Sequence, residues 1–219
     1  MFEASKTKLI WRDDEKEFIQ GEGIDIGCGP DPIFETAVHF DINDGDANQI
    51  RNYIHREFDY VFSAHCLEHM NDPRKAIVDW WQLVRRGGRM IIIVPDEDLY
   101  EQGYWPSLFN EDHKWSFTIA KRKSWNLNSV NVLELAQLLP DGKIRSLELQ
   151  NIEYDMRMLS HGIHARRVAI FLRRVEAVID KNLMLSFIRK PLIRLLKIPV
   201  DQTYYGALAQ IQLVIEKCR

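Results

Sequence analysis

Apolar residues in the first half of this chain form short runs that alternate with helix-like stretches. Apolar runs at 23–26, 38–41, 58–65 and 90–94 predict strands, and the last of these runs is continuous enough for a strand buried on both faces. The stretch 73–85 has Ile77, Trp80, Trp81 and Val84 at three- to four-residue spacing, which predicts an amphipathic helix. Strands that alternate with helices favour an α/β fold with a parallel sheet.

The ends of the helix at 73–85 are marked by residues that favour helix boundaries. Asn71 or Asp72 can cap its start, and Pro73 suits the first turn because proline lacks the N–H that has no partner there. Gly87-Gly88 is expected to end it.

The rest of the chain predicts a less regular arrangement. An N-terminal helix is expected over 3–20, and the irregular stretch 97–127 is long enough to be a lid or binding loop. The helix at 164–180 should have Val168, Phe171, Leu172, Val175 and Val178/Ile179 on one face. The other expected elements, in chain order, are a helix at 128–139, a strand at 143–150, an apolar and basic stretch at 183–198 broken by Pro191, and a last strand at 207–216.

Composition indicates one domain spanning 1–219. A chain of this length with 46% hydrophobic residues can bury a sizeable core, and no apolar run is long enough to span a membrane. The first residues lack the apolar core of a signal peptide. Cys28, Cys66 and Cys218 are too few and too scattered for a disulfide framework or a zinc site. We therefore expect reduced thiols in a cytoplasmic protein.

The net charge of -3 hides an asymmetry. Between Arg157 and Lys197 there are ten Lys and Arg against two acidic residues, so the remainder of the chain is acidic. A basic and partly apolar segment could meet phosphate groups, a membrane surface or an acidic partner, or it could be an ordinary solvated helix face. For 183–198 the alternatives are peripheral membrane contact, a pair of core helices, and the contact of a homodimer.

The most informative stretch is Gly23-Ile24-Asp25-Ile26-Gly27-Cys28-Gly29-Pro30. A strand that ends in a carboxylate leads into a glycine turn, where backbone N–H groups can approach a ligand closely. Three further blocks follow in order, namely a strand ending in Asp41, then Ser63-Ala64-His65-Cys66-Leu67-Glu68-His69, then Gly87-Gly88 with the strand that ends in Val94-Pro95-Asp96.

In that order the blocks resemble the class I S-adenosylmethionine-dependent methyltransferases, over residues 22 to 96. The resemblance implies a Rossmann-like, doubly wound and mostly parallel sheet with an antiparallel last strand, which makes 155–203 a helical insertion before that strand. Only about seven residues separate Pro30 from the second strand, so the first crossover helix can have one turn at most. The next helix, around 47–57, is also short, which is typical of compact relatives.

The resemblance also implies which residues hold the cofactor, S-adenosylmethionine. Asp25 would reach the methionine ammonium, and Asp41 would accept the ribose hydroxyls. Asp46 and Ala47 would flank the adenine, although Asp41 and Asp46 also suit an acid-rich turn. The full set of expected cofactor residues is Asp25, Gly27, Cys28, Gly29, Asp41, Ile42, Asp46, Ala47, Ser63, Ala64 and His65.

Methyl transfer needs a base only where the acceptor must lose a proton. The expected catalytic residues are His113, in a His-Lys-aromatic segment typical of bacterial relatives, and His69; Asp96 and His65 are further candidates. Trp105, Trp115 and Arg166 are expected to bind the substrate, because aromatic faces suit sugar rings and arginine suits phosphate. No metal site is expected, since the sequence fixes no third ligand beside the Glu68 and His65/His69 group.

These features favour a methyltransferase acting on a small-molecule or glycan acceptor, on oxygen, over two alternatives. An NAD-dependent oxidoreductase would have a third glycine where Pro32 stands, and its acidic residue would lie further from Gly27 than Asp41 does. A non-catalytic cofactor-binding module of the same fold remains open. Nucleic acid is not expected as a partner, because the body of the chain is acidic and Ser63-Ala64-His65-Cys66 replaces the motif of base-modifying relatives.

Overall fold

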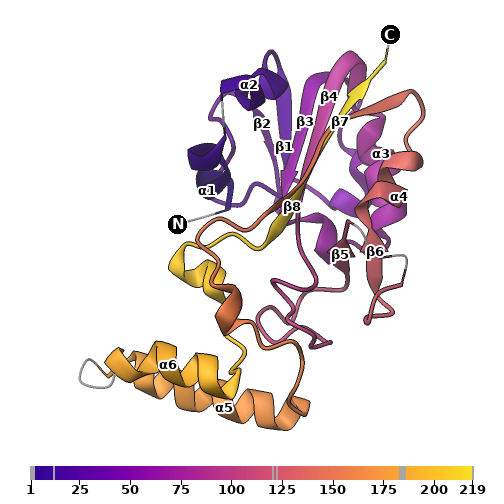
Figure 1. Ribbon diagram of the computed structural model, residues 1–219. Coiled ribbons are helices and arrows are strands. Elements are labelled where there is room, and N and C mark those ends of the chain that lie inside the picture. Colours follow the sequence, from indigo (N-terminus) through magenta and orange to yellow (C-terminus); the bar gives the residue numbers. More distant parts are fainter. Residues whose placement is uncertain (1–2, 12, 120, 122, 183–185, 219) are drawn as a thin grey trace.

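The computed structural model describes residues 3–11, 13–119, 121, 123–182 and 186–218, and places a six-stranded sheet at its centre (Figure 1). The strands are β1 (Gly23–Ile26), β2 (Val38–Phe40), β3 (Phe58–Ala64), β4 (Val84–Pro95), β7 (Gly142–Gln150) and β8 (Gln210–Lys217). Their order is β2-β1-β3-β4-β8-β7, and β8 runs antiparallel to both of its neighbours while the first four strands are parallel. The expected fold class, with an antiparallel last strand, is confirmed.

Alternating side chains of β3 and β4 build a core on each face of the sheet. Val61, Met90, Ile92 and Val94 point to one face, which is covered by α3 (Pro73–Trp81) and α4 (Val132–Gln137). Phe62, Ile91 and Ile93 point to the other face, where Trp11 and Ile19 pack on them. Figure 1 shows the N-terminal helices α1 (Glu3–Ile10) and α2 (Asp13–Lys16) on that second face.

The crossover elements near the cofactor loop are as short as the sequence predicts. No helix forms among residues 27–37, between β1 and β2. Only a 3-10 helix, Ala47–Asn52, lies between β2 and β3, and the Asp46 side chain caps it by accepting from the backbone N of Asn48. Asp72 and Pro73 begin α3 as expected, with Asp72 accepting from the backbone N of Arg74 at 2.9 Å.

Several predicted boundaries are wrong. The N-terminal helix is broken into α1, α2 and a 3-10 turn at Glu17–Ile19. The helix expected at 73–85 ends at Trp81, because β4 begins at Val84 and includes Gly87 and Gly88. The helix expected at 128–139 is α4 preceded by the short strand β6 (Ser129–Asn131), which pairs with β5 (Ser116–Thr118). In the last two cases pairing with a neighbouring strand competes with the local helical pattern.

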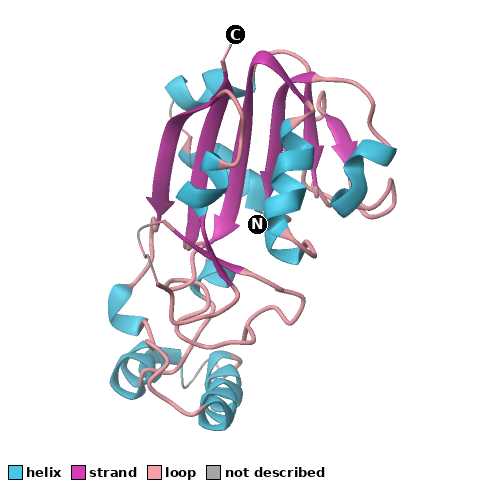
Figure 2. Ribbon diagram, turned by 90° about the vertical axis from the view of Figure 1, so that its right-hand side faces the viewer, coloured by secondary structure: helices cyan, strands magenta, loops and turns pink. Residues whose placement is uncertain are grey.

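The segment between β7 and β8 forms a helical hairpin beside the lid, away from the sheet (Figure 2). It consists of α5 (Arg166–Asp180) and α6 (Ser186–Leu196), with 3-10 turns at Met156–Met158 and Gln202–Tyr205. Pro191 does not break this segment, since it lies inside α6. Residues 183–185 of the basic stretch expected at 183–198 lie outside the described residues.

The residues predicted to share a face of α5 differ in exposure. Leu172 and Ile179 are buried or half-buried, but four of the residues assigned to the same face are exposed. These exposed residues are Val168, Phe171, Val175 and Val178. The described part of the chain contains no helix that combines the length and hydropathy needed to cross a bilayer.

Candidate active site

The loop after β1 is built around a glycine that a larger residue could not replace without displacing its neighbour. Gly27 has φ +76°, and a Cβ there would lie 2.5 Å from both Cβ and Sγ of Cys66. Its N–H donates to the backbone O of Phe40 at 2.7 Å, which joins the loop to the end of β2. Gly29 then donates its N–H to Oδ2 of Asp41 at 2.5 Å. The loop and Asp41 are therefore positioned by each other at the carboxyl edge of the sheet.

A cavity of about 720 Å³ opens at this edge, and we refer to it as the cofactor cavity. Its volume lies within the range of about 300–1,000 Å³ that is usual for small-molecule sites. Six residues expected to bind the cofactor line it, namely Gly27, Asp41, Ile42, Asp46, Ala47 and His65. The sequence analysis missed a further group that lines it, namely Phe40, Gly45, Asn48, Cys66, Met70, Glu111, Asp112 and Lys114.

Two of the carboxylates that line the cofactor cavity, Asp41 and Asp46, can still accept hydrogen bonds from a ligand. Asp41 accepts from the backbone N of Gly29 through Oδ2 and from that of Ile42 through Oδ1, which uses two of the roughly four lone-pair positions of a carboxylate. Asp46 accepts from Asn48 through Oδ1 only, and these bonds hold the pKa of Asp46 below its usual value. These two acceptors fit the hydroxyl and amino donors of the ribose diol and the adenine of S-adenosylmethionine.

The other expected cofactor residues do not line the cavity. Asp25 is buried and accepts from the backbone N of Ile33 at 2.6 Å, and burial raises the pKa of Asp25 to about 7. Ser63 donates its hydroxyl to the backbone O of Ile26 at 2.9 Å. Burial likewise raises the pKa of Cys28 to about 11. Neither Gly29 nor Ala64 lines the cavity.

A second cavity, of about 260 Å³, shares His65 and His69 with the cofactor cavity; we refer to it as the acceptor cavity. Both predicted catalytic residues, His69 and His113, line it. Its remaining lining is mostly polar or aromatic and consists of His65, Glu68, Tyr100, Asn110, Asp201, Thr203, Tyr204, Ala207, Ala209 and Gln210.

Two histidines and two buried carboxylates meet at the floor of the acceptor cavity. His113 Nδ1 lies 2.8 Å from Oε1 of Glu101, and its Nε2 lies 3.9 Å from Oε1 of Glu68. His69 packs edge-on against His113 with ring centroids 5.1 Å apart. Burial alone would raise the pKa of Glu68, but His65, His113 and His69 together hold the pKa below its usual value.

The lid brings His113 to this cluster through backbone contacts that the sequence does not reveal. The backbone N–H groups of Lys114 and Trp115 both donate to the backbone O of Glu68, at 2.9 and 3.2 Å. The indole of Trp115 donates to the backbone O of Met70 at 3.0 Å. The third potential metal ligand beside Glu68 and His69, which sequence analysis did not find, is therefore His113. Glu101 was missed because no local pattern distinguishes it.

The remaining base candidates have structural partners. Asp96 accepts from the backbone N–H groups of Asp98 and Leu99 through Oδ1, and burial raises its pKa to about 6. His65, at φ +53°, lies with Nε2 3.1 Å from Gln210 Oε1 and Nδ1 3.3 Å from Glu68 Oε1. Asp96 thus caps the turn after β4, and His65 braces the turn after β3.

The three residues expected to bind the substrate line neither cavity. Trp115 packs against the main core, where it holds the lid to the turn at 67–70. Arg166 begins α5 and donates to the backbone O of Pro106 and of Ser107. Trp105 lies half-exposed in the lid. The aromatic and basic residues predicted to bind the substrate make contacts of the lid and the hairpin. The aromatic residues that line the acceptor cavity are instead Tyr100 and Tyr204.

Comparison with known proteins finds a family model and several solved structures that are similar to parts or all of this chain. Residues 28–92 match the family model described as "Methyltransferase domain". No curated protein matches the chain in sequence. The structure aligns with a Bacillus halodurans protein provisionally described as a methyltransferase, at 11% identity and a TM-score of 0.49, over 99% of this chain and 98% of that one.

A second structure, Haemonchus contortus phosphoethanolamine N-methyltransferase 2 with S-adenosylhomocysteine bound, aligns at 15% identity and a TM-score of 0.46, over 93% of this chain and 51% of that one. The YcgJ protein of Bacillus subtilis aligns at 15% identity and a TM-score of 0.47, over 91% of this chain and 93% of that one.

The segment that matches the family model supplies β2, β3 and most of β4, together with Asp41, Asp46 and the turn at 65–69. This segment is less than a third of the chain, and it is similar to the methyltransferase domain.

Proposed function

We propose that the protein transfers the methyl group of S-adenosylmethionine to an oxygen of a small-molecule or glycan acceptor. The observation that carries the proposal is that the cofactor and acceptor cavities share His65 and His69. A methyl group held at that junction would have the acceptor on its far side, as an in-line displacement requires. Positioning of this kind can supply most of the catalysis, because the sulfonium already activates the methyl carbon.

The histidines support oxygen as the acceptor atom, because a hydroxyl must lose its proton during transfer. His69 Nδ1 lies 3.1 Å from the backbone O of Asp112, and a carbonyl can only accept, so Nδ1 carries the proton. In the neutral ring, Nε2 of His69 is then free of a proton and able to take one. His113 is arranged in the same way by the Glu101 carboxylate.

The lining of the acceptor cavity supports a polyhydroxylated acceptor. Asn110, Asp201, Thr203 and Gln210 offer side-chain donors and acceptors around the aromatic side chains. Aromatic faces beside hydrogen-bonding groups suit the alternation of C–H and O–H groups on a sugar ring.

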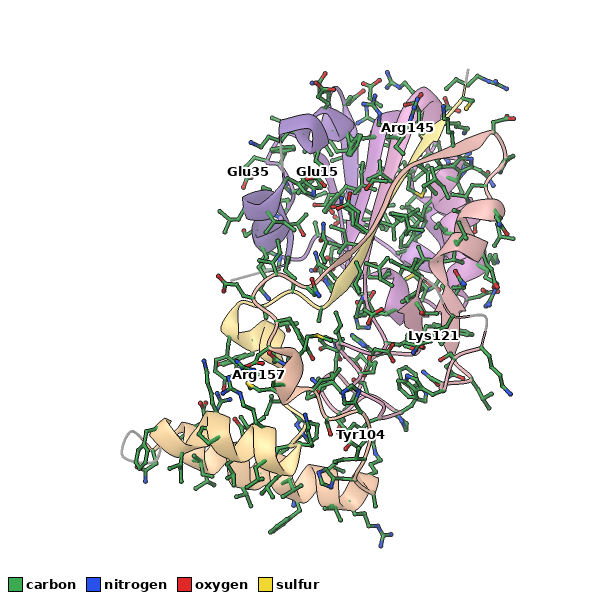
Figure 3. The ribbon with its side chains drawn as sticks, viewed as in Figure 1. Glu15, Glu35, Tyr104, Lys121, Arg145 and Arg157 are labelled. Atoms are coloured by element: carbon green, nitrogen blue, oxygen red, sulfur yellow. The ribbon has the colours of Figure 1, made fainter. Side chains whose placement is uncertain are left out.

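The first test is calorimetric titration with S-adenosylhomocysteine. We expect Asp41→Asn to bind more weakly by at least tenfold, since a hydrogen bond to a charged group contributes about 1.5–3 kcal/mol. Glu35→Gln, an exposed carboxylate away from both cavities, is the matched control (Figure 3). Equal affinity in Asp41→Asn and wild type would contradict the ribose role. Absence of binding by folded wild-type protein would refute the methyltransferase proposal, whereas binding without transfer to any acceptor would favour the non-catalytic cofactor-binding module.

The second test follows label from methyl-labelled S-adenosylmethionine into sugars and glycolipids. We expect product with a methyl ether, and loss of product in His69→Ala while S-adenosylhomocysteine still binds. Product carrying the label on nitrogen or sulfur would refute transfer to oxygen.

For a partner surface we propose the outer face of the α5–α6 hairpin, as a contact with an anionic membrane. Exposed apolar residues there alternate with basic residues such as Arg167, Arg174 and Lys190. The two acidic residues of the hairpin are engaged internally, since Arg189 pairs with Glu176 and Asp180. Such a surface would hold the enzyme beside a lipid-linked acceptor.

A further inference from the structure

Glu68 has an environment that is unusual for a carboxylate. Its side chain is fully buried, and among the described residues neither carboxylate oxygen has a hydrogen-bond partner. Its ion pairs are with histidines, His65 Nδ1 at 3.3 Å and His113 Nε2 at 3.9 Å from Oε1. Burial of a charged group is costly unless the group is paired, hydrogen-bonded or bound to a metal ion. Glu68 is therefore paired with histidines only, and a cation bound to its oxygens would offset the cost of its burial further.

His69 and His113 complete a set of three metal-ligating side chains around Glu68. One ligand atom from each of the three residues lies within 4.8 Å of the others. Two metal–ligand bonds of about 2.1 Å span at most about 4.2 Å, so a small side-chain adjustment would close the three atoms on one ion. Two imidazoles and one carboxylate are a set that suits divalent transition metals better than Mg²⁺, which prefers oxygen ligands.

Both imidazoles are held from behind, as metal-ligating histidines usually are. His113 Nδ1 is fixed by the buried Glu101 at 2.8 Å, and His69 Nδ1 by the backbone O of Asp112 at 3.1 Å. Each contact places the proton on Nδ1 and leaves Nε2 as the ligand atom. In many metal sites a carboxylate accepts a hydrogen bond from the histidine that binds the metal. This arrangement accounts for the burial of Glu101 behind His113.

We propose that Glu68, His69 and His113 bind a divalent transition-metal ion at the floor of the acceptor cavity. All three residues line that cavity, so the remaining coordination positions of the ion would face the acceptor. A hydroxyl bound there has a lowered pKa. Its O–H bond breaks and the proton leaves to water. The oxygen then forms a bond to the methyl carbon as the carbon–sulfur bond breaks, and that electron pair stays on sulfur.

The chemical use of the ion rests on the proposed transfer to oxygen, whereas its binding does not. With an ion bound, the two imidazoles act as ligands and do not accept the proton of the acceptor. The ion instead favours loss of that proton, because it lowers the pKa of the bound hydroxyl.

The experiment is titration of the full chain with Co²⁺, followed by the visible absorption of the bound ion, and with Zn²⁺ by calorimetry. We expect one ion per chain, little competition from Mg²⁺, and loss of at least tenfold in affinity in Glu68→Gln and in His113→Asn. Glu101→Gln should weaken binding by about 10- to 100-fold, because it removes only the group that orients His113. His55→Asn, an exposed histidine outside the cluster, should bind like wild type.

Binding of S-adenosylhomocysteine reports separately whether each variant is folded and whether the proposed function holds. If folded wild-type protein binds neither Co²⁺ nor Zn²⁺ at millimolar concentration, the metal site is refuted even where methyl transfer is observed. Binding that is unchanged in both Glu68→Gln and His113→Asn, or lost equally in His55→Asn, would place the ion elsewhere and refute it too. Should one variant fail to fold, Glu101→Gln and the remaining ligand variant decide.

Discussion

Gly27 and Gly29 lie two positions apart in the cofactor loop, but an added Cβ would meet different surroundings at each. At Gly27 it would overlap Cys66, whereas at Gly29 nothing lies within 4 Å. Both residues have positive φ, so alanine carries a backbone cost of about 1–2 kcal/mol at either position. Only Gly27 adds a steric cost that displaces the turn after β3.

We therefore expect Gly27→Ala to lose S-adenosylhomocysteine binding and to unfold at lower urea concentration than Gly29→Ala. The double variant Gly27→Ala/Cys66→Ala should recover part of the loss, because it removes the Sγ that the new methyl group overlaps. Calorimetry and urea titration measure both effects. Equal losses in the two single variants would show that backbone conformation alone explains the loop.

Asp25 gives the folded state a defined dependence on pH. Burial raises its pKa from 3.8 to about 7, so the folded state holds a proton that the unfolded state releases above pH 4. Stability contributed by this group is fully present below about pH 4, is lost as pH rises from about 4 to 7, and does not change further above that. At about 1.4 kcal/mol per pKa unit, the loss is on the order of 4 kcal/mol by pH 8.

Asp25→Asn should remove this dependence, since the amide oxygen can still accept from Ile33 and cannot ionise. We expect the variant to be about as stable as wild type near pH 4 and increasingly more stable between pH 4 and 7, with the largest difference kept at pH 8, in urea titrations of the protein without ligand. Stability curves that run parallel from pH 5 to 8 would contradict the raised pKa.

Helix α5 of the hairpin has apolar residues both on its buried face and on its exposed face. Ala169 packs with Tyr104 and Leu108 of the lid, and Leu172 packs against the cluster that includes Ile193 of α6. The opposite face of α5 presents Phe171 and Val178, which are 63% and 67% exposed. The apolar residues of α5 are thus divided between packing against the lid and α6 and exposure to solvent, a division that helical spacing alone does not predict.

The double variant Phe171→Ser/Val178→Ser should bind vesicles containing phosphatidylserine at least tenfold more weakly than wild type. Each apolar side chain that enters the interface contributes about 1.5–3 kcal/mol. Stability should change little, since both residues are exposed. Leu127→Ser, at a residue that is 99% exposed and outside the hairpin, is the matched control in a flotation assay. If the wild-type protein does not bind vesicles but forms a dimer that the double variant dissociates, this face binds a second copy of the chain and the membrane proposal is wrong.

At the scale of the whole molecule, the lid connects the carboxyl edge of the sheet to the hairpin. Figure 3 shows Tyr104 between these parts, and its hydroxyl pairs with Ser160 at 3.0 Å. Tyr154 donates to the backbone O of Leu99 at 2.6 Å and lies 3.2 Å from Nε2 of Gln102, whose amide also donates to the backbone O of Val200. Burial strongly raises the pKa of Tyr154, so its hydroxyl remains a donor at neutral pH.

Tyr154→Phe should therefore lower the free energy of unfolding by about 1–3 kcal/mol, because the buried oxygen of Leu99 loses its donor. Tyr53→Phe, at a half-exposed tyrosine, is the control. Urea unfolding followed by tryptophan fluorescence gives the comparison. If Tyr154→Phe lowers the free energy of unfolding less than Tyr53→Phe does, water replaces the hydroxyl as the donor to the backbone O of Leu99.

The sequence determined the parts of this protein that depend on local chemistry. The apolar runs gave the parallel strands, the glycine loop and Asp41 marked the cofactor cavity, and the spacing after Pro30 predicted the missing crossover helix. Asp72 and Pro73 fixed the start of α3. These features could be read because each depends on residues close together in the chain.

Only the tertiary structure determined which residues line the acceptor cavity. Glu68, Glu101 and His113 are far apart in sequence, and they meet because backbone groups of the lid donate to the turn after β3. Trp115 and Arg166 are used for packing and backbone contacts, which aromatic and basic patterns cannot distinguish from substrate binding. The exposed face of α5 depends on what packs against the other face. Contacts between distant segments carry no local signal, and they place every group that would contact the acceptor.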